Sequence, residues 1–233
     1  MNPVSRAQIA ALFPQLSGFA TARAATRTAV DRVRNLALRT TLHYFGLPPV
    51  RPVVLPNAVF DALQAPAIIG TFHIGPTHAL GVAIERLPGE VLVLRRRAYE
   101  PAQAKNVQVA ETAGSEEQRA RAFHRAVGQL RGGGYVLLPI DPQEAARVPA
   151  PFFGRTLLLA RGAFALARVA RAPILPVVTR WRSVRVEIHC GPLIEPEDSE
   201  EAMAAIAAGW LESYLAGAPG EVTPRVFQLL RES

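Results

Sequence analysis

The chain contains a single cysteine, Cys190, among its 233 residues. One cysteine cannot form an internal disulfide, and it excludes the thiolate clusters that hold structural metal centres. Lysine is equally scarce, because Lys105 is the only one and Arg carries almost all of the positive charge. Aromatic residues make up 7 % of the chain, and no basic segment is interleaved with them. The composition therefore argues against a nucleic-acid-binding protein.

The sequence also lacks an apolar run that suits a membrane-spanning helix. An uncharged stretch of 23 residues, 62–84, contains two Pro, two His, three Gly and two Thr, which disfavour a helix in lipid. The N-terminus does not resemble a secretory signal, since apolar residues 10–13 are few and Pro14 interrupts them. We therefore expect a cytoplasmic protein that is soluble or peripheral to the inner face of the cytoplasmic membrane.

Positive charge is abundant but unevenly distributed. The net charge is +7, yet residues 195–233 carry two Arg against eight acidic residues, so the excess lies in residues 1–194. A basic body suits an anionic partner such as phospholipid headgroups, a nucleotide-bearing cofactor or nucleic acid, and the composition makes nucleic acid the weakest of the three. A solvated basic surface without a partner is the alternative.

The N-terminal part reads as helical, with a break at residues 14–18, and we place a helical segment at residues 1–48. Over residues 21–42, basic and apolar side chains separate onto two sides of a helix: Arg23, Arg27 and Arg34 on one, and Val30, Val33 and Ala37 on the other. This pattern predicts a basic amphipathic helix. Such a helix more often packs on its own domain than lies on a bilayer.

Short apolar runs alternate with helical segments over residues 49–233, which we assign to one α/β domain. The predicted strands are residues 67–72, 90–94, 135–140, 174–179 and 184–190, the last as an edge strand. The predicted helices are residues 77–86, 115–130, 155–169, 199–216 and 222–231, with a loop at 98–115. This alternation predicts a mixed, largely parallel central sheet flanked by helices.

Polar side chains follow three of the predicted strands. His73 and His78 follow the first, Arg95 the second, and Asp141 with Gln143 the third. Because ligands in open α/β sheets bind beyond the carboxyl ends of the strands, we expect these residues to converge there. His73, His78 and Asp141 could instead hold a divalent metal in a hydrolase, although two His five positions apart across a Gly-Pro corner is an unspecific spacing.

Six segments in order along the chain form a recognisable set: Gly70-Thr-Phe-His-Ile-Gly-Pro-Thr-His78, Val91-Leu-Val-Leu-Arg95, Leu130-Arg-Gly-Gly-Gly-Tyr-Val-Leu-Leu-Pro-Ile-Asp141, Pro151-Phe-Phe-Gly154, Arg161 to Pro176, and Trp210 to Glu221. They cover about residues 62–225. In this order they resemble the lysophospholipid acyltransferase superfamily, most closely the late (lauroyl or myristoyl) acyltransferases of bacterial lipid A biosynthesis.

The resemblance implies transfer of a fatty acyl group from an acyl carrier protein or coenzyme A thioester to a hydroxyl of a lipid-type acceptor. No cofactor beyond that co-substrate is implied. His73 would be the general base, with His78 and Asp141 completing the catalytic group. Arg95 would neutralise phosphate or the developing oxyanion. Gln143, Phe152, Phe153 and Gly154 would contribute to substrate binding, with ordinary core packing as the alternative for the two Phe.

The chain departs from this family at position 78, where the family has a carboxylate and this chain has His. A neutral His78 can orient His73, but it cannot supply the negative charge that stabilises a protonated imidazole. Either another acid, such as Asp141 or Glu144, supplies that charge, or the chemistry is altered or lost. A lipid- or acyl-binding protein without catalysis is therefore the alternative function. We also expect no N-terminal membrane anchor of the kind this family has, so membrane contact would come from the basic helix or from apolar surface near Phe152.

Overall fold

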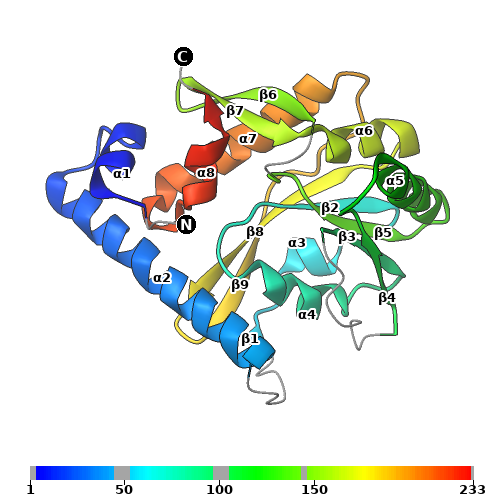
Figure 1. The fold of residues 1–233 in the computed structure, drawn as a ribbon, viewed down its shortest axis with the longest axis horizontal. Helices are drawn as coiled ribbons and strands as arrows, with labels where there is room; N and C mark the ends of the chain where they lie inside the picture. Colours follow the sequence, from blue (N-terminus) through cyan, green and yellow to red (C-terminus); the bar gives the residue numbers. More distant parts are fainter. Residues whose placement is uncertain (1–3, 45–52, 97–104, 143–145, 232–233) are drawn as a thin grey trace.

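The computed structural model describes residues 4–44, 53–96, 105–142 and 146–231, with side chains described to residue 36 in the first of these ranges. Within them, two sheets are formed (Figure 1). The larger consists of β1 (Val53–Val54), β2 (Ala67–Thr71), β3 (Val91–Arg95), β4 (Val107–Glu111), β5 (Tyr135–Pro139), β8 (Ile174–Arg182) and β9 (Arg185–Cys190). The smaller consists of β6 (Arg147–Phe152), β7 (Arg155–Ala160) and β10 (Leu230–Arg231).

The larger sheet has the strand order β1-β9-β8-β2-β5-β3-β4. All neighbouring pairs are parallel except β8 and β9, which form an antiparallel hairpin. The prediction of a largely parallel mixed sheet is confirmed. The expected edge position of residues 184–190 is wrong, because the short strand β1 pairs with the outer side of β9.

Helices cover both faces of this sheet, as expected for strands that are buried on both sides. The helices are α1 (Arg6–Leu12), α2 (Gly18–Tyr44), α3 (Ala58–Asp61), α4 (Leu80–Ile84), α5 (Glu116–Arg131), α6 (Arg161–Ala170), α7 (Glu200–Gly217) and α8 (Pro224–Leu229), with 3₁₀ turns η1 (Thr77–Ala79) and η2 (Pro219–Glu221). Successive residues of β2 contribute to different cores: Ile68 packs with residues of α5, α6 and α7, and Ile69 with residues of α3 and α4. Both side chains are fully buried.

The start of α5 forms a capping box. Ser115 Oγ accepts a hydrogen bond from the Gln118 N–H (3.3 Å), and Gln118 Oε1 accepts one from the Ser115 N–H (3.1 Å). The helix ends at Gly132, and Gly133 then takes a positive φ of 80° at the turn into β5.

The structure differs from the sequence prediction in several stretches. Residues 230–231, expected to end a helix, form strand β10, which pairs with β7. Residues 155–160, expected to begin a helix, form strand β7, and α6 begins only at Arg161. Leu and Ala favour helix in isolation, but here pairing with β6 overrides that preference. Residues 107–111, expected to be loop, form the edge strand β4 beside β3. Residues 98–104 of that expected loop lie outside the described residues.

The N-terminal helix α2 packs on the α/β unit through small side chains. Thr21, Ala24 and Thr28 of α2 are buried, and Thr28 Oγ1 donates to the Gly220 carbonyl at 3.1 Å. The valines, which the sequence sets apart as the apolar side of this helix, face outward: Val30 is 44 % exposed and Val33 67 %. The expected boundary at residue 48 lies outside the described residues.

The single thiol provides a test of the packing around β9. Burial, and to a smaller extent the nearby charge of Asp61, raise the pKa of Cys190 to about 12. Because only the thiolate reacts, alkylation by iodoacetamide at pH 8 should be about 10³-fold slower in the native protein than in guanidinium chloride. Mass spectrometry measures the alkylation rate in both conditions. Native and denatured rates within tenfold of each other would show that this thiol is accessible in the native state.

Candidate active site

His73 lies two residues beyond the end of β2, at a sharp turn. The Phe72 N–H donates to the Val177 carbonyl at 3.1 Å, and the Ile74 N–H donates back to the Phe72 carbonyl at 2.7 Å. The second bond closes a three-residue γ-turn centred on His73. Phe72 and Ile74 are each 1 % exposed, whereas the His73 side chain is 39 % exposed. The two apolar neighbours therefore anchor the turn and leave the imidazole at the surface of the site.

Gly75 allows this turn to lie against β8. Thr179 Oγ1 donates to the Ile74 carbonyl at 3.0 Å, which brings the two backbones into contact. Gly75 has a φ of +68°, and a Cβ at this position would lie 1.8 Å from the Thr179 carbonyl oxygen. A glycine is required here for both reasons.

Asp141 reaches His73 from the neighbouring strand. The parallel register pairs Thr71 of β2 with Pro139 of β5, and His73 and Asp141 each follow two residues later. Asp141 Oδ1 lies 2.6 Å from His73 Nδ1, and Asp141 Oδ2 accepts the His73 backbone N–H at 2.8 Å. The carboxylate thus holds both the ring and the turn that carries it.

Arg225 of α8 lies on the other side of this carboxylate. Its Nε donates to the Asp141 carbonyl at 2.8 Å and lies 4.0 Å from Asp141 Oδ2. The Asp141 side chain is 4 % exposed, so a positive charge close to it offsets part of the cost of burial. No sequence pattern marked Arg225, because 84 residues separate it from Asp141.

The bond to Nδ1 determines what the imidazole can do. An ionised Asp141 accepts a hydrogen bond from Nδ1–H, which leaves the lone pair of the neutral ring on Nε2. No residue within the described ranges bonds to Nε2. The site therefore combines a buried carboxylate, an imidazole held in one orientation, and an Nε2 that no described residue bonds. This is the arrangement of a general base.

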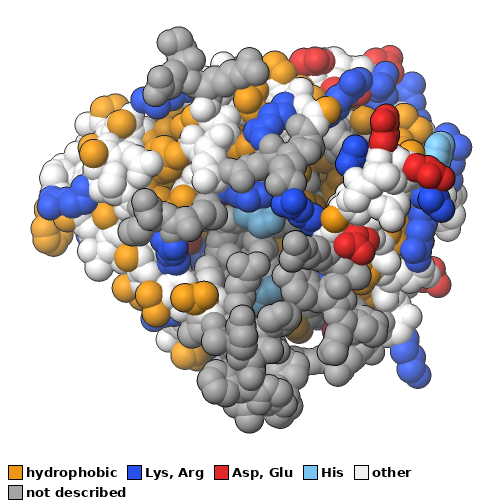
Figure 2. All heavy atoms as spheres, viewed as in Figure 1, with side chains coloured by type: hydrophobic (Ala, Val, Ile, Leu, Met, Phe, Trp, Pro, Cys, Tyr) orange, Lys and Arg blue, Asp and Glu red, His pale blue; other side chains and the backbone are white. Residues whose placement is uncertain are grey.

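Arg95 ends β3, the strand on the far side of β5. The register between these strands pairs Val93 with Leu137, so Arg95 lies level with Pro139 at the same sheet edge as His73 and Asp141. The expected convergence of three polar strand ends is thus observed at the level of the backbone. On the face shown in Figure 2, histidine atoms lie near the centre with Lys or Arg atoms beside them.

His78 lies in η1, five positions beyond His73, and is partly buried. The acidic partner of His73 is Asp141, not a group at position 78. Gln143 and Glu144 lie outside the described residues. Among the residues that the structure describes, no three His, Cys, Asp or Glu side chains are grouped closely enough to hold a metal ion. His73, His78 and Asp141 therefore do not form the metal site that the sequence left open.

Phe152, Phe153 and Gly154 form the turn of the β6–β7 hairpin. Phe153 and Gly154 have φ values of +47° and +68°, so they occupy the two central positions of a type I′ turn. Phe152 is fully buried, and Phe153 packs edge-on against both Phe152 (4.8 Å) and Phe13 (5.1 Å). These contacts are core contacts, and a substrate-binding role for the three residues stays a prediction.

No protein-family model matches the chain, and no curated protein matches it in a sequence comparison. None of the helices within the described ranges is long and apolar enough to cross a membrane.

The turn at Gly75 can be tested by a pair of alanine substitutions. Gly75→Ala should destabilise the protein by about 2–4 kcal/mol, because it adds left-handed strain and a clash with a backbone carbonyl that cannot rotate away. Gly81→Ala, at an open helical position in α4, should stabilise by about 0.5–1 kcal/mol. Urea unfolding measures both, and an unchanged midpoint for Gly75→Ala would contradict the packing described.

Proposed function

We propose that the protein is an acyltransferase-like enzyme that moves a fatty acyl group from a thioester to a hydroxyl of a lipid-type acceptor. The observation that carries this proposal is the His73–Asp141 pair at the carboxyl edge of a parallel sheet. The ordered sequence segments around it, which resemble bacterial lipid acyltransferases, support the choice of acyl transfer over other uses of a general base.

In this proposal the acceptor hydroxyl binds at His73 Nε2. As its oxygen attacks the thioester carbonyl, the O–H proton passes to Nε2 and a C–O bond forms. The tetrahedral intermediate then collapses, the C–S bond breaks, and the departing thiolate takes the proton back from the imidazolium. The products are the acyl ester and a free thiol, and His73 returns to its neutral form.

Asp141 supplies the negative charge that position 78 lacks. Its carboxylate stabilises the imidazolium formed during attack, and its bond to Nδ1 keeps the proton-accepting nitrogen directed at the substrate. Arg225 positions Asp141 through the main-chain carbonyl. His78 follows His73 by five positions, in η1, and its catalytic role is proposed from its place in the motif.

The donor would be an acyl carrier protein or coenzyme A thioester, both of which carry phosphate, and no further cofactor is needed. Arg95 would bind that phosphate or the oxyanion of the intermediate. With net charge +7, the protein suits anionic substrates. We place its activity in bacterial lipid metabolism at the cytoplasmic side of the membrane.

Product analysis tests the proposal directly. The protein is incubated with acyl-coenzyme A or acyl-acyl carrier protein and a panel of lysolipids, and acylated products are identified by mass spectrometry. We expect His73→Ala to abolish product formation and His124→Ala, an exposed His on α5, to leave it unchanged. Equal background rates for wild type and His73→Ala would indicate an acyl- or lipid-binding protein without catalysis.

Asp141→Asn removes the charge but keeps the size of the side chain. Loss of the orienting carboxylate should lower kcat by about 10³–10⁴-fold with little change in KM. Thermal unfolding of the variant serves as the control for folding. A folded Asp141→Asn variant with a wild-type rate would show that Asp141 is not the partner of the base.

Arg225→Gln tests the positioning role of Arg225. Because Gln cannot reproduce the Nε bond or the charge, we expect kcat to fall about tenfold, with KM affected less. Arg121→Gln, on the exposed face of α5, is the matched control and should leave the rate unchanged. A shift in KM alone would instead place Arg225 in substrate binding.

A further inference from the structure

Helix α2 presents its larger apolar side chains to solvent. Phe19 is 81 % exposed, Val30 44 % and Val33 67 %, while the buried side of the helix consists of Thr21, Ala24 and Thr28. With about 100° between successive helical residues, the three exposed side chains fall within about 60° of one another. They form one apolar stripe along the helix.

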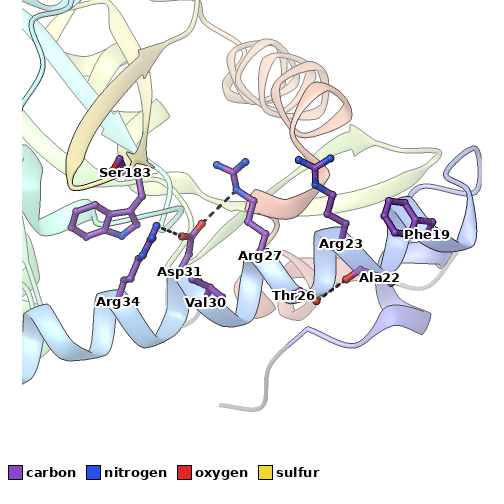
Figure 3. Close-up of a pocket in the computed structure, with 10 residues that line it drawn as sticks. Phe19, Ala22, Arg23, Thr26, Arg27, Val30, Asp31, Arg34 and Ser183 are labelled. Atoms are coloured by element: carbon purple, nitrogen blue, oxygen red, sulfur yellow. Dashed lines mark hydrogen bonds and ion pairs between the residues drawn. The ribbon is translucent and has the colours of Figure 1, made fainter.

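Arginines border this stripe. Arg23 follows Phe19 by four positions and Arg34 follows Val30 by four, so each lies beside an apolar member of the stripe. Arg23, Arg27 and Arg34 extend to the same side of α2 (Figure 3). With Trp181 of β8 they line an open groove of about 630 Å³ along the helix.

Not all of this charge is neutralised by the protein. Arg27 pairs with Glu221 at 2.7 Å, and Arg34 with Asp31 at 3.6 Å. Arg23 is exposed and forms no ion pair with any residue that the structure describes. The outer surface of residues 18–36 therefore combines an apolar stripe with excess positive charge.

Polar contacts hold the helix in this orientation. In addition to the Arg27–Glu221 pair, the Trp181 indole Nε1–H donates to Asn35 Oδ1 at 2.8 Å. These bonds attach α2 to η2 and β8 by its polar residues. The stripe thus faces outward as a consequence of specific bonds.

We propose that this face of α2 docks the protein on a bilayer that contains anionic phospholipid. Phe19, Val30 and Val33 enter the boundary between headgroups and acyl chains, and Arg23 and Arg34 lie among the lipid phosphates. Arg side chains alone would suit any polyanion, but exposed Phe and Val beside them match the two-layered chemistry of a membrane surface.

Docking through α2 brings the candidate active site close to the membrane. Thr179 of β8 bonds to the turn that carries His73, and Trp181, two residues farther along the same strand, bonds to α2. Two residues of strand span about 7 Å. The proposal does not depend on acyl transfer, because it concerns a surface that can be tested by binding alone.

Sedimentation with vesicles tests the docking surface. Wild-type protein should bind vesicles of phosphatidylcholine with 30 % phosphatidylglycerol and not vesicles of phosphatidylcholine alone. Arg23→Glu with Arg34→Glu should weaken binding at least tenfold, since each Arg near an anionic surface contributes about fivefold. Phe19→Ser with Val33→Ser should weaken it about tenfold or more.

Two control variants match these changes elsewhere on the surface. Arg121→Glu on α5 reverses an exposed charge, and Val169→Ser on α6 removes an exposed apolar side chain. Both should bind vesicles as wild type does. Binding reduced as strongly by the controls as by the α2 variants would mean that the whole basic body, and not this face, attracts the membrane.

Insertion is measured separately from electrostatic attraction. A Phe19→Trp variant should show blue-shifted emission on anionic vesicles and quenching by lipids brominated on their acyl chains. No quenching, with binding lost only in the charge variants, would overturn insertion of the stripe. Sedimentation equilibrium shows whether the protein dimerises through this face. A dimer that is dissociated by Phe19→Ser with Val33→Ser would show that the stripe is a self-association surface. Failure of that dimer to bind vesicles would overturn the proposal.

Discussion

The parallel pairing of β2 with β5 is the constraint on which the candidate site depends. It sets Thr71 opposite Pro139, and the backbone then carries His73 and Asp141 forward by the same two residues. A slip of one position would turn the carboxylate to the opposite face of the sheet. Several buried apolar residues on both strands, such as Ile68 opposite Val136, prevent that slip because they would lose their places in the two cores.

Burial makes this arrangement stringent. A carboxylate that is almost inaccessible to water is unfavourable unless donors surround it, and Asp141 is held by the His73 N–H, by His73 Nδ1 and by the nearby Arg225. One of these donors belongs to the main chain. The acid is therefore tied to the γ-turn as well as to the imidazole, which limits the movement of the pair as a unit.

The core of the fold was predictable because β2, β3, β5 and β8 are short apolar runs bounded by Gly, Pro or charge. His73, Arg95 and Asp141 lie at the carboxyl ends of β2, β3 and β5, so they could be predicted to be neighbours. What local pattern could not show was pairing between distant segments. The sequence of residues 155–160 favours a helix, but pairing with β6 makes them a strand. Residues 107–111 form a strand because they pair with β3. Arg225 reaches Asp141 through tertiary packing of α8, which no spacing along the chain encodes. The outward position of Val30 and Val33 likewise depends on which side of α2 finds bonding partners.

The bond from Arg225 to the Asp141 carbonyl has a consequence for biosynthesis. Because synthesis proceeds from the N-terminus, β2 and β5 leave the ribosome before α8 exists, and they can pair without it. At that stage Asp141 has His73 as a partner but not yet Arg225. The site is complete only when residues 224–229 have emerged and folded back across the smaller sheet. A nascent chain could thus possess the sheet and the His–Asp pair while still lacking the contact that stabilises the buried charge.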